Sequence, residues 1–193
     1  MPPSTAAEAA VLPVSRIGGR AREDDAALVR AARAGSRDAV EALFRRHWRR
    51  LYRAAYAISQ DAAAAEDIAQ EAFLSALGAL DRFDRRRPLR PWLDRIAANR
   101  AIDHLRARAA RAEVLGADWL DAAALTDEPH DDLLRVLRDL PDEQRAAIAL
   151  RHLLGFTPRE IGRMLGLPVG TVNSRMRRGL DRLAERLDEE AGA

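Results

Sequence analysis

The side chains of this chain that are best suited to binding another molecule are its arginines, which carry every fixed positive side-chain charge because the sequence contains no lysine. A guanidinium group is planar and donates two parallel hydrogen bonds to a phosphate or to the edge of a guanine. Residues 81–111 hold ten Arg against four acids, and residues 159–186 hold seven Arg against three acids. Residues 112–145, between them, hold ten acids against three Arg. This segregation predicts two phosphate-facing surfaces and an acidic segment that DNA repels, with solvated helix faces as the simpler alternative.

The second basic block begins with a pattern typical of a helix-turn-helix unit. Thr157 can cap a helix, Pro158 suits its first position, and Glu160 can complete a capping box. Gly166 permits the left-handed backbone that ends this helix, and a longer helix is predicted over 169–187. The second helix of such a unit lies in the major groove, whereas a plain helical hairpin would only expose a solvated basic face. The residues predicted to face duplex DNA are Gly170, Thr171, Asn173, Ser174, Arg177 and Arg178.

Helices are the elements that must position these residues. Apolar residues, many of them Ala, make up 48% of the chain, aromatic residues make up 5%, and runs of β-branched residues are absent, which argues against sheets. Ser36 and Asp61 can cap two of the helices, and Glu160 and Arg175 could form an ion pair between two others. The helices are predicted near residues 24–34, 37–58, 62–80, 91–108, 130–140, 142–154, 158–165 and 169–187.

The length of 193 residues suits two small domains better than one. The predicted fold class is all-α, with two small helical domains joined by a flexible acidic linker and a helix-turn-helix in the second domain. We expect a disordered arm over 1–22, a first domain over 23–111, a linker over 112–128 and a second domain over 129–188. The absence of Cys excludes disulfides and cysteine zinc sites, and no apolar stretch could span a bilayer. We therefore expect a cytoplasmic protein without metal or cofactor.

Three motifs, in order along the chain, resemble those of the extracytoplasmic-function sigma factors of bacteria. Residues 65–73 (Ala-Glu-Asp-Ile-Ala-Gln-Glu-Ala-Phe) are similar to the polymerase-binding motif of region 2 in that family. Residues 83–106, with Pro91-Trp92-Leu93 and Asn99-Arg100, resemble its minus-10-reading segment. Residues 140–175 resemble its region 4. The resemblance covers roughly residues 25–187 and implies a factor that directs core RNA polymerase to specific promoters and promotes DNA melting.

The resemblance also implies roles for individual residues. Clamp helices of the largest polymerase subunit would be bound by Asp67, Ile68, Gln70, Glu71 and Phe73. The melted minus-10 strand would be held by Arg85, Arg86, Arg87, Arg90, Asn99, Arg100 and Asp103, with Trp92 expected in the core and not as a stacking platform. Region 4 would bind the minus-35 element as a duplex. Its target sequence does not carry over, because Asn173 and Arg177 depart from side chains common in the family. The expected partners are core RNA polymerase, promoter DNA and, in some family members, an anti-sigma factor.

Two other functions compete with this interpretation. An ordinary helix-turn-helix regulator would bind DNA as a dimer without polymerase, and the N-terminal motifs argue against it. A DNA-acting enzyme such as a recombinase would need a supported nucleophile, but Ser36, Ser59 and Ser75 have no matching base constellation in the sequence. We therefore expect no enzymatic activity.

Overall fold

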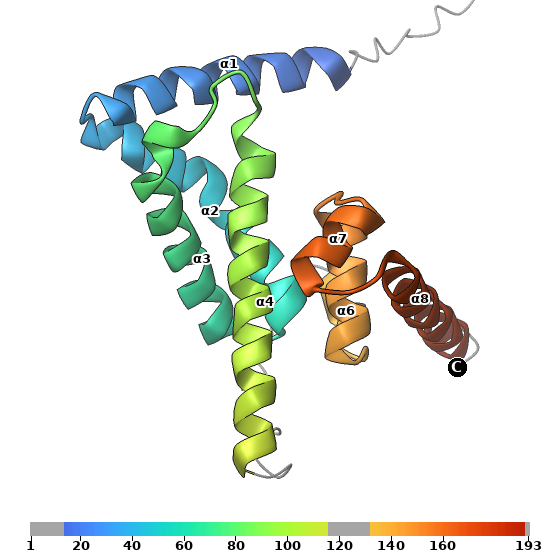
Figure 1. Ribbon diagram of the computed structural model, residues 1–193. Helices are drawn as coiled ribbons and strands as arrows, with labels where there is room; N and C mark the ends of the chain where they lie inside the picture. Colours follow the sequence, from blue (N-terminus) through green and yellow to red (C-terminus); the bar gives the residue numbers. More distant parts are fainter. Residues whose placement is uncertain (1–13, 116–131, 192–193) are drawn as a thin grey trace, which may run out of the picture.

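The computed structural model describes residues 14–115 and 132–191, and the regular elements in these two ranges are all helical (Figure 1). We call residues 14–115 the N-terminal half and residues 132–191 the C-terminal half. The all-helical fold class predicted from composition is confirmed. Within the described ranges, no helix is both long and apolar enough to cross a membrane.

The N-terminal half is a bundle of three long helices that a fourth crosses at one end (Figure 1). Its core contains side chains from all four, including Val29, Leu43, Phe73 and Leu93. Phe44 packs edge-on against Phe73, with 5.1 Å between the ring centroids. The elements are α1 (Val14–Arg33), α2 (Arg37–Ser59), α3 (Ala62–Gly78), the short 3-10 turn η1 (Leu80–Arg82) and α4 (Leu89–Leu115).

Two predicted caps set where α2 and α3 begin. The Ser36 hydroxyl accepts a hydrogen bond from the Ala39 amide, and the Asp61 carboxylate accepts one of 2.9 Å from the Ala64 amide. Both bonds satisfy amides of the first helical turn that have no partner inside the helix. Gln60 lies between the two helices in the left-handed region, with φ of 53°, so α2 reverses into α3 through a very short connection.

The C-terminal half contains α5 (Asp132–Leu137), α6 (Asp142–Ile148), the π-helical turn η3 (Ala149–Leu153), α7 (Pro158–Leu165) and α8 (Val169–Ala191). The sequence predicted one α-helix over 142–154, but its last turn is wider than an α-helix. The Leu154 amide donates to the Ala149 carbonyl, five residues back, and the Phe156 amide donates to the Leu150 carbonyl. This wider turn ends at Gly155, with φ of 78°, and returns the Phe156 ring to the core.

Two predicted boundaries are wrong. Helix α1 begins at Val14, so residues 14–22 of the expected disordered arm are helical. A helix can form here because the stretch contains no proline, and its two glycines weaken a helix by only about 1 kcal/mol each. Helix α4 runs to Leu115, into the expected linker, because residues 109–115 are mostly good helix formers. Its end has no amphipathic pattern, since Val114 is 83% exposed. The rest of the expected arm and most of the expected linker lie outside the described residues, in 1–13 and 116–131.

The two halves are packed against each other as well as joined by the chain. Helix α6 and the turn η3 contact α2, and α7 contacts α4. One apolar cluster takes Tyr56 and Ile102 from the N-terminal half and Leu137 and Leu150 from the C-terminal half. The prediction of two tethered domains did not include this shared core.

Candidate nucleic-acid interface

The helix-turn-helix begins with the predicted capping box. The Thr157 amide donates to Oε2 of Glu160 at 2.9 Å, and the Glu160 amide donates to the Thr157 hydroxyl at 3.3 Å. The hydrogen bond from the Thr157 amide lowers the pKa of Glu160 below its ordinary value. Gly166 ends the helix in the left-handed region, with φ of 71°. The predicted start and end of α7 are therefore confirmed.

Close packing fixes α8 relative to α7 and α6. A Cβ on Gly162 of α7 would lie 2.7 Å from the Leu167 carbonyl oxygen, and a Cβ on Gly179 of α8 would lie 2.5 Å from Cδ1 of Ile148. Arg175 of α8 pairs with Glu143 at 2.8 Å. The predicted Glu160–Arg175 pair is wrong, because the Glu160 carboxylate is held by its own cap.

One stretch of α8 faces solvent and carries the residues predicted to bind duplex DNA. The side chains of Asn173, Ser174, Arg177 and Arg178 are exposed, as is Gly170, and Thr171 is half-buried. The opposite side of the helix buries Val172. The structure thus brings the six predicted residues together on one accessible face, which we call the duplex face. Contact between this face and DNA stays a prediction.

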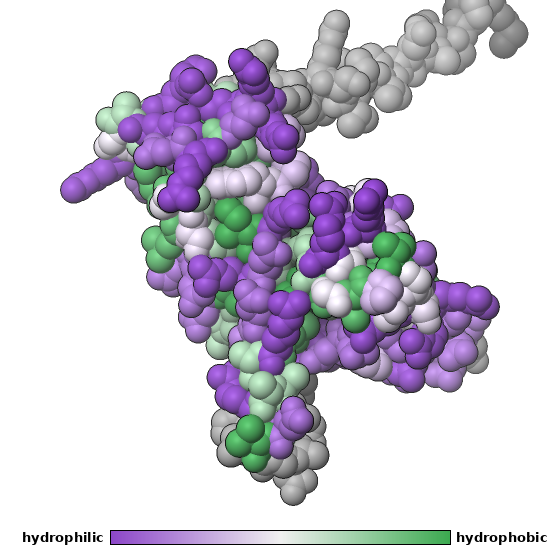
Figure 2. Space-filling model, viewed as in Figure 1, coloured by the Kyte–Doolittle hydropathy of each residue, from purple (hydrophilic) through white to green (hydrophobic). Residues whose placement is uncertain are grey.

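A cleft of about 510 Å³ lies where the loop after η1 meets the start of α4. Phe83 and Trp92 form one aromatic wall, with ring centroids 4.8 Å apart and planes inclined by 39°. Three arginines line the cleft with two carboxylates, and Figure 2 shows hydrophilic residues gathered over this end of the molecule. Its lining residues are Arg82, Phe83, Asp84, Arg87, Pro88, Pro91, Trp92, Arg95, Phe156 and Glu160. Aromatic faces beside guanidinium groups suit an unpaired base and its phosphate.

Two partly buried polar contacts position this cleft. Arg33 of α1 donates to the carbonyl of Leu80 and, at 2.6 Å, to that of Phe83, which holds the turn before the loop. Arg50 of α2 makes a two-bonded contact, at 2.7 and 2.6 Å, with the buried carboxylate of Asp94. Asp94 lies between Trp92 and Arg95 in sequence, so this contact anchors the first turns of α4 beside the cleft.

The residues predicted for the minus-10 strand are only partly brought together. Arg87 lines the cleft, whereas Arg85, Arg86 and Arg90 are exposed but do not line it. Asn99 and Asp103 follow Arg95 at helical spacing along α4 and are exposed. Arg100 points to α3 instead, where it donates to the Ser75 hydroxyl at 2.9 Å and lies 3.5 Å from Glu71.

Sequence reasoning missed Arg82 and Arg95 and assigned Trp92 to the core. Trp92 is in fact half-buried: it packs on the core and also lines the cleft. A signal was present, because Trp92 and Arg95 are three residues apart and therefore lie on one face of the helix.

Helix α3 exposes Asp67, Gln70 and Glu71, as predicted for a surface that binds polymerase. Ile68 and Phe73 were predicted for the same surface but are core residues, 5% and 6% exposed, so their side chains are not available for docking. Both belong to the inward stripe of α3, which the helical period separates from the outward one. Leu74, 58% exposed, is the apolar side chain that this face does present. We call Asp67, Gln70, Glu71 and Leu74 the docking face.

Comparison with known proteins gives two family matches. Residues 43–111 match the model of sigma-70 region 2, and residues 130–183 match the model of sigma-70 region 4. The chain is 37% identical over 177 residues to the ECF RNA polymerase sigma factor SigM of Mycobacterium tuberculosis, a match that covers 91% of this chain and 90% of SigM. It is 31% identical over 176 residues to the ECF RNA polymerase sigma factor SigW of Bacillus subtilis, covering 82% and 94% of the two chains.

Solved structures are similar over most of the chain. CnrH, solved in complex with the cytosolic domain of CnrY, is 31% identical with a TM-score of 0.55, and the match covers 86% of this chain and 98% of that one. The sigma factor RpoE of Bartonella quintana, solved in complex with the anti-sigma factor NepR, is 25% identical with a TM-score of 0.58, covering 77% and 96%.

Proposed function

The chain belongs to the extracytoplasmic-function branch of the sigma-70 family, and from that premise we propose that it joins core RNA polymerase and directs it to specific promoters. Its duplex face binds the minus-35 element, and its N-terminal half holds the melted minus-10 strand. Like sigma factors in general, it is a non-catalytic initiation factor, and its place of action is the cytoplasm, where the polymerase works.

The observation that carries this proposal is the cleft beside Phe83 and Trp92. A regulator that binds only duplex DNA needs a helix-turn-helix and no site for an unpaired base. Here an aromatic wall with Arg82, Arg87 and Arg95 lies at the start of α4, in the half of the chain that does not hold the helix-turn-helix. An extruded base would stack on the half-buried ring of Trp92, which packs against the buried ring of Phe83, while the arginines neutralise its backbone. Asn99 and Asp103 would extend this site along α4.

The docking face supports the other half of the proposal. Asp67 and Glu71 are four residues apart, so their carboxylates lie on one side of α3 with Leu74 one helical turn beyond Gln70. An acidic surface with an apolar anchor complements a basic helix pair. Helix α3 lies on the opposite side of α4 from α6 and α8 (Figure 1), so polymerase can reach this face past the C-terminal half.

A protein inhibitor is a further proposed partner. RpoE was solved in complex with the anti-sigma factor NepR, and its match covers 77% of this chain. An anti-sigma factor for this chain would compete for the surfaces that polymerase and DNA use.

Two charge-removing variants test whether the duplex face binds DNA and the docking face binds polymerase. Arg178→Ala should weaken binding to minus-35 duplex by about tenfold or more, as expected for one arginine contact to a base or phosphate, and should leave affinity for core polymerase unchanged. Asp67→Ala should weaken affinity for core polymerase and leave duplex binding unchanged. Arg135→Ala and Glu113→Ala are matched controls, since each removes one exposed charge from the same half of the chain.

Affinity for core polymerase is measured by fluorescence anisotropy of the labelled chain, and duplex binding is measured at fixed salt because phosphate contacts make it salt-dependent. Loss of polymerase binding in Arg178→Ala would contradict the assignment of DNA binding and polymerase binding to separate faces. No binding of the unaltered chain to core polymerase would contradict the proposed function itself.

A further inference from the structure

One face of α2 carries four arginines that line the same pocket. They are spaced by three, one and three residues along the helix, so the helical period brings all of them to one side. The pocket has a volume of about 350 Å³. The four arginines are Arg46, Arg49, Arg50 and Arg53. We call this pocket the arginine pocket.

The arginine pocket has an apolar wall beside its charges. Leu153 and Leu154, at the end of η3, are half-buried and line it. None of the described residues that line the pocket is acidic. In the cleft beside Trp92, by contrast, Asp84 and Glu160 lie among the arginines. The arginine pocket therefore suits a ligand that has both negative charge and an apolar part.

Buried carboxylates hold two of the four arginines in place. Nη1 of Arg46 donates to Asp25 at 2.9 Å, and its Nη2 lies 3.8 Å from Asp24. Arg50 uses Nε and Nη2 for the carboxylate of Asp94, which leaves its Nη1 for a ligand. Donors that are already fixed lose little side-chain freedom when an anion binds to them.

The other two arginines add charge at the open side of the pocket. Arg49 and Arg53 are exposed, and Arg49 makes no hydrogen bond or ion pair with another described residue. Arg46 and Arg50 are four residues apart, as are Arg49 and Arg53, and like charges at this spacing destabilise a helix. An anion in the pocket would relieve this repulsion.

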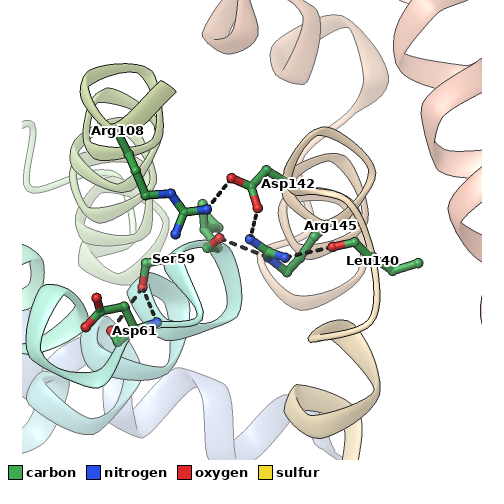
Figure 3. A network of polar contacts seen from close by, with 7 residues as sticks. Ser59, Asp61, Arg108, Leu140, Asp142 and Arg145 are labelled. Atoms are coloured by element: carbon green, nitrogen blue, oxygen red, sulfur yellow. Dashed lines mark hydrogen bonds and ion pairs between the residues drawn. The ribbon is translucent and has the colours of Figure 1, made fainter. Parts of the chain in front are cut away.

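A second group of arginines, around Arg145, shows the contrast. Arg145 is buried and donates to the Ile58 carbonyl at 3.1 Å and to the Leu140 carbonyl at 2.7 Å (Figure 3). Its remaining nitrogen pairs with Asp142, whose second oxygen pairs with Arg108. Each nitrogen of this guanidinium has a partner inside the protein, so Arg145 offers nothing to a ligand.

We propose that the arginine pocket binds a nucleotide that carries two or more phosphates. The arginines take the phosphates, because a guanidinium donates paired hydrogen bonds to phosphate oxygens, and the leucines cover one face of the base. The volume lies at the lower end of the range for small-molecule pockets, about 300–1,000 Å³, and suits a single nucleotide. The pocket is separate from the duplex face on α8, the docking face on α3 and the cleft at the start of α4.

Equilibrium dialysis of the free, full-length chain against radiolabelled ATP, in buffer without divalent cations, tests this site. We expect saturable binding of one ATP per chain. Unlabelled AMP should compete less well than unlabelled ATP, because it brings fewer phosphates to the arginines. Inorganic tripolyphosphate should also compete less well, because only the nucleotide covers the leucines. No saturable binding up to millimolar ATP would overturn the proposal, and equal competition by tripolyphosphate would overturn the assignment to a nucleotide.

Arg49→Ala should weaken ATP binding about tenfold, as expected for the loss of one hydrogen bond between charged groups. Arg49→Lys keeps the charge without the planar fork, so its affinity should lie between those of Arg49→Ala and the unaltered chain. Arg45→Ala is the matched control, because Arg45 is an exposed arginine one helical turn away that does not line the pocket. It should keep the affinity for ATP within about twofold, since salt screens its longer-range effect. An equal loss in both alanine variants would mean unspecific attraction to α2 and would overturn the pocket.

Two further measurements show whether ATP binds elsewhere. Arg87→Ala removes an arginine from the cleft beside Trp92. Loss of ATP binding in Arg87→Ala, with binding retained in Arg49→Ala, would place the nucleotide in that cleft and overturn the proposal. Affinity for a random-sequence pool of single-stranded DNA is measured as well. If Arg49→Ala lowered it as much as it lowered affinity for ATP, the arginines would form a DNA-binding surface and the nucleotide site would be wrong. These measurements need no polymerase, so their outcome is independent of the proposed function.

Discussion

The turn of the helix-turn-helix depends on the absence of a side chain at Gly162. A Cβ built there would lie 2.7 Å from the Leu167 carbonyl oxygen, a backbone atom that cannot rotate away. Relieving such overpacking costs about 1–3 kcal/mol. Replacing a helical glycine with alanine returns up to about 1 kcal/mol from helix propensity. We therefore predict that Gly162→Ala lowers the free energy of unfolding by about 1–2 kcal/mol.

The control is Gly170→Ala, because no atom outside its own helical neighbourhood lies within 4 Å of a Cβ built on that residue. It should leave stability unchanged or raise it by up to about 0.5 kcal/mol. Thermal unfolding followed by circular dichroism resolves the difference, since 1 kcal/mol moves the midpoint by about 2–4 °C in a chain of this size. Equal midpoints for the two variants would refute the steric reasoning. The turn also sets the orientation of α8. Gly162→Ala should therefore weaken binding to the minus-35 duplex by more than the loss of folded protein alone explains.

Three further predictions concern the polar groups that fix the helices. Thr157→Ala removes the cap of α7 and should lower the free energy of unfolding by about 1 kcal/mol. Urea unfolding measures this loss, and the dependence of the free energy on urea concentration should stay unchanged. No loss of stability would mean that the capping box is not formed in solution. Asp94→Ala leaves Arg50 without its buried two-bonded partner. It should lower the free energy of unfolding by about 3 kcal/mol in the same assay and reduce affinity for single-stranded DNA. A loss below about 0.5 kcal/mol would contradict the anchoring role of this contact. Burial raises the pKa of Asp25, but hydrogen bonds from His47 and Arg46 outweigh it and hold the pKa below 3.8. The stability that this carboxylate contributes is thus present at neutral pH and is lost as the pH falls below about 4. Asp25→Asn should therefore flatten the pH dependence of the unfolding midpoint between about pH 6 and pH 3. An unchanged pH dependence would contradict this link between the pKa of Asp25 and stability.

The parts of the fold that sequence could predict are those set by neighbouring residues. The caps at Ser36, Asp61 and Thr157 and the left-handed glycine at Gly166 each depend on contacts within a few positions, and all four are present in the structure. The exposed face of α8 followed from helical period alone, and the structure confirms that its predicted residues are accessible. Local chemistry of this kind leaves few alternatives.

The parts that could not be predicted depend on contacts between distant segments. The bond from Arg145 to the Ile58 carbonyl joins positions 87 residues apart, and no local pattern marks an arginine as buried. The place of Glu160 beside the cleft likewise follows from how the two halves pack. The assignment of Ile68 and Phe73 to the docking face failed for another reason. A motif names neighbouring residues together, whereas a helix turns only about every third or fourth residue into the core.

The most direct test of the account is reconstitution of transcription. The purified chain is added to core RNA polymerase from the same organism with fragmented genomic DNA, and the 5′ ends of the transcripts are mapped. We predict new starts that share two sequence elements, one near minus-10 and one near minus-35, and that lose the minus-35 preference with Arg178→Ala. Transcripts that begin at the same places with and without the chain would contradict the account.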